Sequence, residues 1–154
     1  MLRISKLTDY SIVVLTDMAR DAARVHNAAQ LASEANIAPP TVSKILKGLA
    51  RAGLLVSYRG ASGGYRLARA PEHISVAAII DAMEGPISLT ECGEADGLCE
   101  QEPVCAVRGH WQWINRAIRV ALESVTLADM THSGGGTTVA LQDFRHRLSD
   151  LRPG

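Results

Sequence analysis

The stretch from Asn27 to Arg69 constrains the fold more than any other part of the chain. Asn27 is a good N-cap for a short helix, "AAQLASEAN". "IAPP" breaks that helix, because proline fits a helix only in its first turn. A second helix, "TVSKILKGLARAG", follows, with Gly53 as its stop. Its apolar residues share one face: Val42, Ile45, Leu46 and Leu49. Two short helices in this arrangement predict a helix-turn-helix.

Two short β-type runs, "LLVSY" and "YRLAR", come next and flank "RGASGG". Glycines at that position permit a tight, exposed tip, so the runs predict a β-hairpin. A helix-turn-helix followed by a hairpin is a winged helix. An amphipathic helix over residues 8–24 precedes this unit. The expected fold is therefore mainly α with a small β-hairpin wing.

The net charge of zero conceals an asymmetry between the two halves of the chain. Residues 1–70 carry ten Lys and Arg against four Asp and Glu, whereas residues 71–154 carry six against twelve. A basic module beside an acidic one indicates anion binding, with nucleic acid as the first candidate. A solvated charged face and a protein-docking winged helix are the alternatives.

In a winged helix the second helix enters the major groove of double-stranded DNA, and the wing reaches the adjacent groove or backbone. The expected DNA-binding residues lie on these two elements: Pro40, Thr41, Ser43, Lys44, Lys47, Arg59 and Ser62.

The acidic half contains two further helical patterns. "EHISVAAIIDAMEG" predicts a short strand, then a helix from the Ser75 cap to about Glu84 with Gly85 as its stop. Residues 86–104 lack periodicity and predict a loop. From Val104 a long helix is expected, with a narrow apolar seam over nearly three heptads: Val107, Trp111, Ile114, Ile118, Ala121 or Leu122, and Val125. This seam predicts a dimerisation helix in a homodimer, and burial within a single chain is the alternative.

All three cysteines, Cys92, Cys99 and Cys105, lie in the loop or at the expected start of the long helix. Acidic neighbours disfavour bare thiolates, and a bound cation reverses that cost. Three thiols need a fourth ligand for tetrahedral zinc or for a cysteine-bound iron–sulfur cluster. His110 is the nearest histidine. The chemistry leaves zinc, an iron–sulfur cluster and metal-free thiols open.

The chain resembles the iron–sulfur winged-helix regulators that include IscR, NsrR and the regulators of SUF operons. The resemblance covers about residues 1–132 and rests on "KLTDYSIVVL", the helix-turn-helix, "RGASGGYRLAR", "ISVAAIIDAMEG" and the three cysteines before a long helix. "CEQEPVCAVRGHWQWINRAI" resembles most closely the SUF-operon type. The resemblance implies a homodimeric transcriptional regulator that reads a pseudo-palindromic operator and senses cluster supply, oxidants or nitric oxide. Control of iron–sulfur assembly genes, with repression by the cluster-bound form, is the first expectation.

The resemblance also implies the ligands of a 2Fe–2S or 4Fe–4S cluster: Cys92, Cys99 and Cys105. Where IscR-type members place a histidine ligand, this chain has Arg108, and His110 is displaced by two residues. NsrR-type members use an aspartate from the other subunit near the start of the first helix, and Asp9 in "LTDY" matches that position. Asp9 is therefore the preferred fourth ligand, with His110 as the alternative. A first-turn acid favoured by the helix dipole is the plain structural interpretation of Asp9.

The expected organisation has three parts: a DNA-binding domain at 1–70, a cluster loop and dimerisation helix at 71–132, and a flexible tail at 133–154. No apolar run is long enough to span a membrane, and a reducing, cytoplasmic compartment is expected. An enzyme with a small-molecule substrate is not expected, because no nucleophile–base set or phosphate loop appears. The other histidines, including His26, are expected at the surface. The rival functions are a winged-helix regulator with structural zinc and a metal-free thiol switch.

Overall fold

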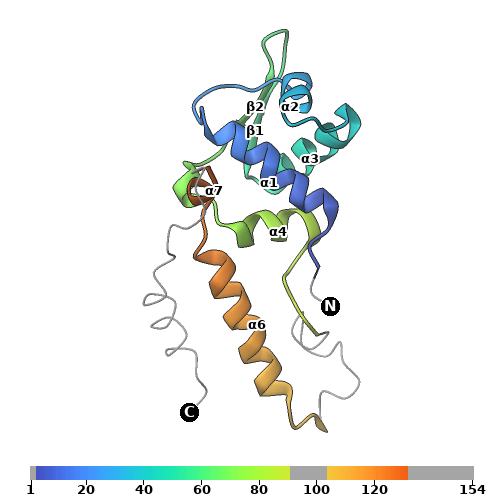
Figure 1. Ribbon diagram of the computed structural model, residues 1–154, viewed down its shortest axis with the longest axis vertical. Helices are drawn as coiled ribbons and strands as arrows, with labels where there is room; N and C mark the ends of the chain where they lie inside the picture. Colours follow the sequence, from blue (N-terminus) through green and yellow to red (C-terminus); the bar gives the residue numbers. More distant parts are fainter. Residues whose placement is uncertain (1–2, 91–103, 132–154) are drawn as a thin grey trace.

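The computed structural model describes residues 3–90 and 104–131. Its elements run in the order α1 (Lys6–Ala19), α2 (Ala28–Glu34), α3 (Pro39–Arg51), β1 (Leu55–Tyr58), β2 (Gly64–Leu67), η1 (Pro71–His73), α4 (Val76–Glu84), α6 (Arg108–Glu123) and α7 (Leu127–Thr131). Figure 1 shows α1, α2, α3 and the hairpin at one end of the molecule, with α6 extending away from them. The expected fold, mainly α with a β-hairpin wing, is confirmed.

Local signals set the ends of α2 and α3. The Asn27 side chain accepts a hydrogen bond from the Ala29 amide at 2.8 Å, as expected of an N-cap. After α2, Asn36 adopts a left-handed φ of 52°, and the Ile37 amide donates to the Ala32 carbonyl at 3.0 Å. This Schellman closure turns the chain directly into α3. α3 begins with its two prolines, which have no amide hydrogens to leave unpaired.

The core joins α1 to α3 and to the later helices. Fully buried side chains come from α1, α3, α4 and α7 and include Leu15, Leu46, Ile79 and Leu127. One contiguous apolar cluster therefore extends from the helix-turn-helix across residue 70 into the C-terminal half. The expected division into three parts stays a prediction.

β1 and β2 form an antiparallel pair in the register Leu55↔Leu67 to Tyr58↔Gly64. The base of this hairpin is fastened to the segment before α2, because His26 and Tyr65 exchange backbone hydrogen bonds of 2.7 and 2.9 Å. The imidazole of His26 also donates through Nε2 to the Asp21 carbonyl at 3.0 Å. His26 is only 6% exposed, so the expectation that it lies at the surface is wrong.

The same contacts explain why α1 is shorter than expected. The predicted helix ran over residues 8–24, whereas α1 covers Lys6–Ala19. Ser5 starts it two residues early by capping the Thr8 amide at 3.2 Å. At the other end, the Asp21 carbonyl is engaged by the His26 ring, and the chain leaves the helix to pair with β2.

The long helix is also shorter than the seam suggested. α6 starts at Arg108 rather than Val104 and ends at Glu123, so Val107 and Val125 lie outside it. The chain then turns, and α7 returns to pack against α1.

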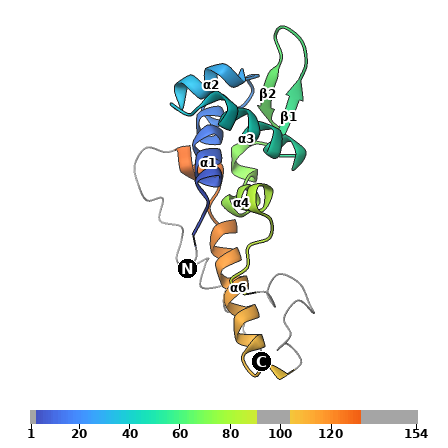
Figure 2. The same cartoon turned by 90° about the vertical axis from the view of Figure 1, so that its right-hand side faces the viewer.

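The expected short strand before α4 is a 3₁₀ turn, Pro71–His73, followed by a single β-bridge between Ser75 and Thr126. Figure 2 shows that α6 projects from the rest of the fold in this view as well. Within the described ranges, no helix has the length and apolar character that crossing a membrane requires.

Candidate DNA-binding face and cysteine site

The outer face of α3 is basic. The inner face is fully buried and consists of Val42, Ile45, Leu46 and Leu49. Because these residues face the core, Lys44 and Lys47 are held on the opposite, exposed side. Neither ammonium group has an acidic partner within the described part of the chain. Two unpaired cations on one helical face are suited to phosphate contacts.

The other expected residues of α3 lie around these lysines. Pro40 is exposed in the first turn, and Thr41 and Ser43 are partly exposed. Arg51 is exposed and continues the stripe formed by Pro40, Lys44 and Lys47 at helical spacing. The sequence interpretation missed Arg51, although its position four residues after Lys47 could have revealed it.

The hairpin supplies a second set of exposed polar groups. Arg59 and Ser62 both lie exposed at its tip, as expected. Arg66 of β2, which the sequence interpretation missed, stacks its guanidinium 5.4 Å from the centroid of the Tyr58 ring across the strand pair. Such stacking holds the guanidinium at the face of the wing while its N–H groups stay available.

Of the three expected thiolate ligands, the structure places Cys105. It lies three residues before the first residue of α6, and its carbonyl accepts a hydrogen bond from the Arg108 amide at 3.4 Å. The side chain is partly exposed and is not in a disulfide. Cys92 and Cys99 lie outside the described residues.

Asp9 lies in the first turn of α1, exposed, with its amide bonded to the Ser5 carbonyl at 3.0 Å. Among the described residues its carboxylate has no hydrogen-bond or salt-bridge partner. Glu84, the last residue of α4, contacts this first turn. One oxygen of Glu84, Oε1, accepts from the Ser5 amide at 2.7 Å and from the Thr8 hydroxyl at 2.5 Å. These hydrogen bonds, that from Thr8 first, hold the pKa of Glu84 below its ordinary value.

Within one chain, Asp9 at the start of α1 and Cys105 just before α6 lie well apart. α6 has 16 residues and is about 24 Å long at the usual helical rise. Its far end meets α4 and α7, whereas its start, next to Cys105, points away from α1 in both views (Figures 1 and 2). His110 is exposed on the first turn of α6. In the described part of the chain, no three His, Cys, Asp or Glu side chains gather as a metal site would require.

The donor set nevertheless suits an iron–sulfur cluster in its chemistry. Cys105 is accessible beside a helix start, and Asp9 offers an unengaged carboxylate. Thiolates are the usual ligands of iron–sulfur clusters. A cluster held by both Cys105 and Asp9 would need them from different chains, because a single chain keeps the two residues apart.

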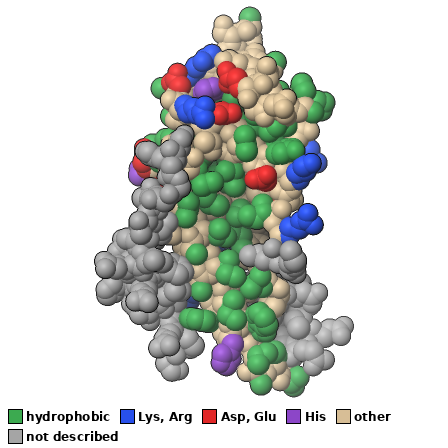
Figure 3. All heavy atoms as spheres, in the orientation of Figure 1, with side chains coloured by type: hydrophobic (Ala, Val, Ile, Leu, Met, Phe, Trp, Pro, Cys, Tyr) green, Lys and Arg blue, Asp and Glu red, His purple; other side chains and the backbone are tan. Residues whose placement is uncertain are grey.

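α6 carries an apolar face that a single chain leaves partly open. Trp111 is 38% exposed and Val107, just before the helix, is 52% exposed. Figure 3 shows hydrophobic side chains in a band that continues from the level of α1 and α4 down along α6. Toward the C-terminal end of the same helix, a hollow of about 480 Å³ is lined in part by Ile4, Ile80, Leu89, Ile118 and Leu122. This face is suited to a second apolar helix.

Asn115 anchors the segment that follows α4 to this helix. It is 8% exposed, and its Oδ1 accepts from the Leu89 amide at 2.9 Å. Its Nδ2 is buried without a hydrogen-bond partner among the described residues. Leu89 lies three residues before Cys92, so this hydrogen bond fastens the last described residues before the first cysteine to α6.

Comparison with known proteins gives consistent results. A family model described as "Rrf2: Iron-dependent Transcriptional regulator" matches residues 4–133. The HTH-type transcriptional regulator NsrR of Halalkalibacterium halodurans is 30% identical over 84% of this chain and 90% of its own length. CymR, the global cysteine regulator of B. subtilis, superimposes with a TM-score of 0.66 at 30% identity, over 85% of this chain and 97% of its own. T. potens IscR gives a TM-score of 0.63 at 26% identity, over 99% of this chain and 94% of its own.

Proposed function

Because this chain belongs to the Rrf2 family of transcriptional regulators, we propose that it is an iron–sulfur-dependent repressor that binds operator DNA as a homodimer. Regulators of this family bind DNA, and the basic outer face of α3 with the exposed wing is suited to that contact. The proposed DNA-binding residues are Pro40, Thr41, Ser43, Lys44, Lys47, Arg59 and Ser62, with Arg51 and Arg66 added from the structure.

The observation that carries the proposal is the position of Cys105. It lies just before the N-terminal end of α6, and that helix packs on α4, which in turn contacts α1 and α3 of the DNA-binding unit. A group bound at Cys105 therefore has a rigid connection to the helices that carry the DNA-binding face. The iron dependence in the family's description supports iron as the bound element.

The exposed apolar face of α6 supports a homodimer. If two copies pair antiparallel along this face, the start of each α6 approaches the α1 end of the other copy. Cys92, Cys99 and Cys105 of one subunit, with Asp9 of the partner subunit, would then hold the cluster, and His110 is the alternative fourth ligand. When bound, the cluster supplies an oxidant- and nitric-oxide-sensitive connection between the subunits.

In this arrangement the chain's own residues transmit the signal. α6 and α4 hold Cys105 and the start of the cysteine segment, while Asp9 belongs to the first helix of the DNA-binding unit. Loss of the connection changes the relative placement of the two α3 helices, and half-site recognition depends on that spacing. We assign residues 1–70 to DNA binding, 71–132 to cluster binding and dimerisation, and 133–154 to a tail.

Operator binding tests the proposal. The full-length chain is prepared without oxygen, divided into cluster-reconstituted and cluster-free portions, and titrated against the DNA of its own promoter region. We expect the two portions to differ in affinity for the operator by at least about tenfold, which is the range of typical allosteric coupling. Equal affinities would contradict cluster-dependent regulation.

A second function has support of its own. The similarity to CymR, whose Staphylococcus aureus relative is also known in an oxidized form, favours a metal-free thiol switch at Cys92, Cys99 or Cys105. A thiol switch would respond to oxidants in protein that contains no iron, and the operator titration of the cluster-free portion with and without oxidant distinguishes the two. A structural zinc site would instead be identified by zinc, without iron, in the purified protein.

A further inference from the structure

Glu84 connects the end of α4 to the first turn of α1, the helix that carries Asp9. It is the last residue of α4, and Gly85 with its φ of 91° then turns the chain toward the segment that carries Cys92. On its other side, Glu84 accepts hydrogen bonds from Ser5 and Thr8, which form the first turn of α1. The residue directly after Thr8 is Asp9.

The contact consists of hydrogen bonds and is partly buried on the α1 side. Thr8 is fully buried, and its hydroxyl lies 2.5 Å from the Glu84 oxygen and 3.1 Å from the Ser5 hydroxyl. The Ser5 hydroxyl in turn caps the Thr8 amide at 3.2 Å. Glu84, which belongs to α4, thus completes the N-terminal cap of α1. Its negative charge lies at the N-terminal end of α1, which is the positive end of the helix dipole.

We propose that Glu84 is a positioning residue, which fixes the first turn of α1 and thereby sets where Asp9 presents its carboxylate. Glu84 itself does not contact the cluster. Through Gly85 it ties the position of Asp9 to the start of the cysteine-bearing segment of the same chain. The role in cluster binding rests on the proposed function, whereas the fixing of α1 does not.

Three single variants of the full-length protein isolate this role. Glu84→Ala removes both acceptor contacts. Glu84→Gln keeps an oxygen at the same place without the charge. Glu72→Ala removes an exposed acid from η1 and is the matched control.

The first measurement is amide hydrogen exchange in cluster-free protein. For Glu84→Ala we expect exchange at Ser5, Thr8 and Asp9 to rise about fivefold, the factor that corresponds to losing one typical helix cap. Exchange at Leu15, in the middle of α1, should rise much less. Glu84→Gln should fall between wild type and Glu84→Ala, and Glu72→Ala should match wild type. Unchanged exchange at the first turn in Glu84→Ala would overturn the proposal.

The second measurement is the rate at which a chelator removes iron from reconstituted protein, for Asp9→Ala, Glu84→Ala and the double variant. If Glu84 acts through Asp9, each single variant accelerates iron loss and the double variant is no faster than Asp9→Ala. Rate factors that multiply in the double variant would overturn the positioning role. If wild-type protein binds no iron at all, the proposed function fails, and the exchange measurement alone then decides whether Glu84 fixes α1.

Discussion

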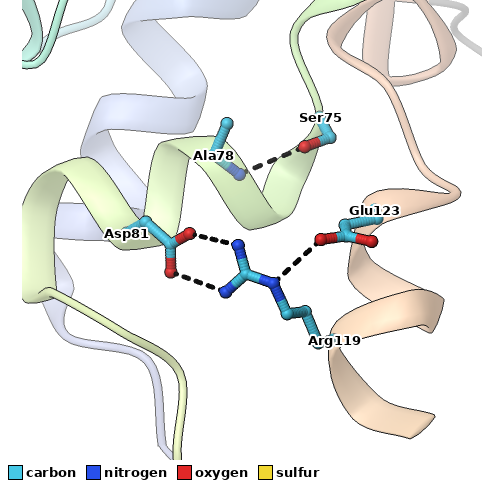
Figure 4. Close-up of polar contacts among 5 residues, drawn as sticks. All are labelled: Ser75, Ala78, Asp81, Arg119 and Glu123. Carbon is cyan, nitrogen blue, oxygen red and sulfur yellow. Dashed lines mark hydrogen bonds and ion pairs between the residues drawn. The ribbon is translucent and has the colours of Figure 1, made fainter. Parts of the chain in front are cut away.

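Asp81 of α4 and Arg119 of α6 form a two-pronged ion pair, with Nη2 2.8 Å from Oδ2 and Nη1 3.4 Å from Oδ1 (Figure 4). Arg119 also donates through Nε to Glu123 at 2.8 Å. The contact to Asp81 raises the pKa of Arg119 above its ordinary value. Arg119 thus connects α6 to the helix that packs beneath α1 and α3.

Arg119→Ala should loosen α6 relative to α4. We expect a loss of about 0.5–1 kcal/mol in the free energy of unfolding, because both side chains are partly exposed and solvent screens the pair. Arg119→Lys should recover only part of this, since an ammonium group cannot form two parallel hydrogen bonds. Urea denaturation measures both values. An equally large loss in Glu123→Gln would show that the stability comes from the contact with Glu123 and not from the contact with Asp81.

Acidification should remove the contribution of the Glu84 carboxylate to the free energy of unfolding. Its pKa is lowered in the folded protein from an ordinary value of 4.5, so its contribution is complete above the unfolded pKa and declines as pH falls through the folded pKa. The difference in unfolding free energy between wild type and Glu84→Gln should be constant near neutral pH and shrink below pH 4.5. Glu72→Gln controls for loss of a surface charge. A difference that grows on acidification would contradict the assignment.

Lys44→Ala and Lys47→Ala should weaken operator binding and its dependence on salt. Removing one phosphate contact should reduce the slope of log K against log salt by about 0.9. Fluorescence anisotropy at several salt concentrations gives the slope. Arg116→Ala, which removes an exposed cation from α6, should leave it unchanged. A reduced slope for Arg116→Ala would place DNA on a different face.

Gly64→Ala should disturb the wing. A Cβ at Gly64 would overlap the backbone oxygen of His26, the atom that pairs with the Tyr65 amide. We expect a loss of about 1–3 kcal/mol in stability, together with weaker operator binding. Gly109→Ala, whose Cβ meets no atom within 4 Å, should be neutral or stabilising by up to about 1 kcal/mol. Calorimetry on both variants tests the contrast, and equal stabilities would contradict the close approach.

The winged helix could be predicted because its boundaries are encoded locally. Asn27, the Pro39–Pro40 pair and Gly53 each act within a few residues of their own position. The end of α1 could not be predicted in this way. It depends on the pairing of His26 with Tyr65, which lies 39 positions further along the chain, and helical periodicity contains no information about such a contact.

The candidate site was predictable in its residue types but not in its connections. The apolar pattern indicated a long helix, but the turn at Ser124 that starts α7 follows from burial of Leu127 against the core. The contacts of Glu84 with Thr8 and of Asp81 with Arg119 join residues 76 and 38 positions apart. Their side chains carried no periodic or motif signal that would pair them.

If the cysteines hold an iron–sulfur cluster, analysis of iron and acid-labile sulfide in anaerobically purified protein will detect it. We expect visible absorption with two or four iron and sulfide per cluster site in wild type. Cys92→Ser, Cys99→Ser and Cys105→Ser should each lose most of both. A colourless protein that takes up zinc, or no metal after anaerobic reconstitution, would show that the cysteines do not hold an iron–sulfur cluster.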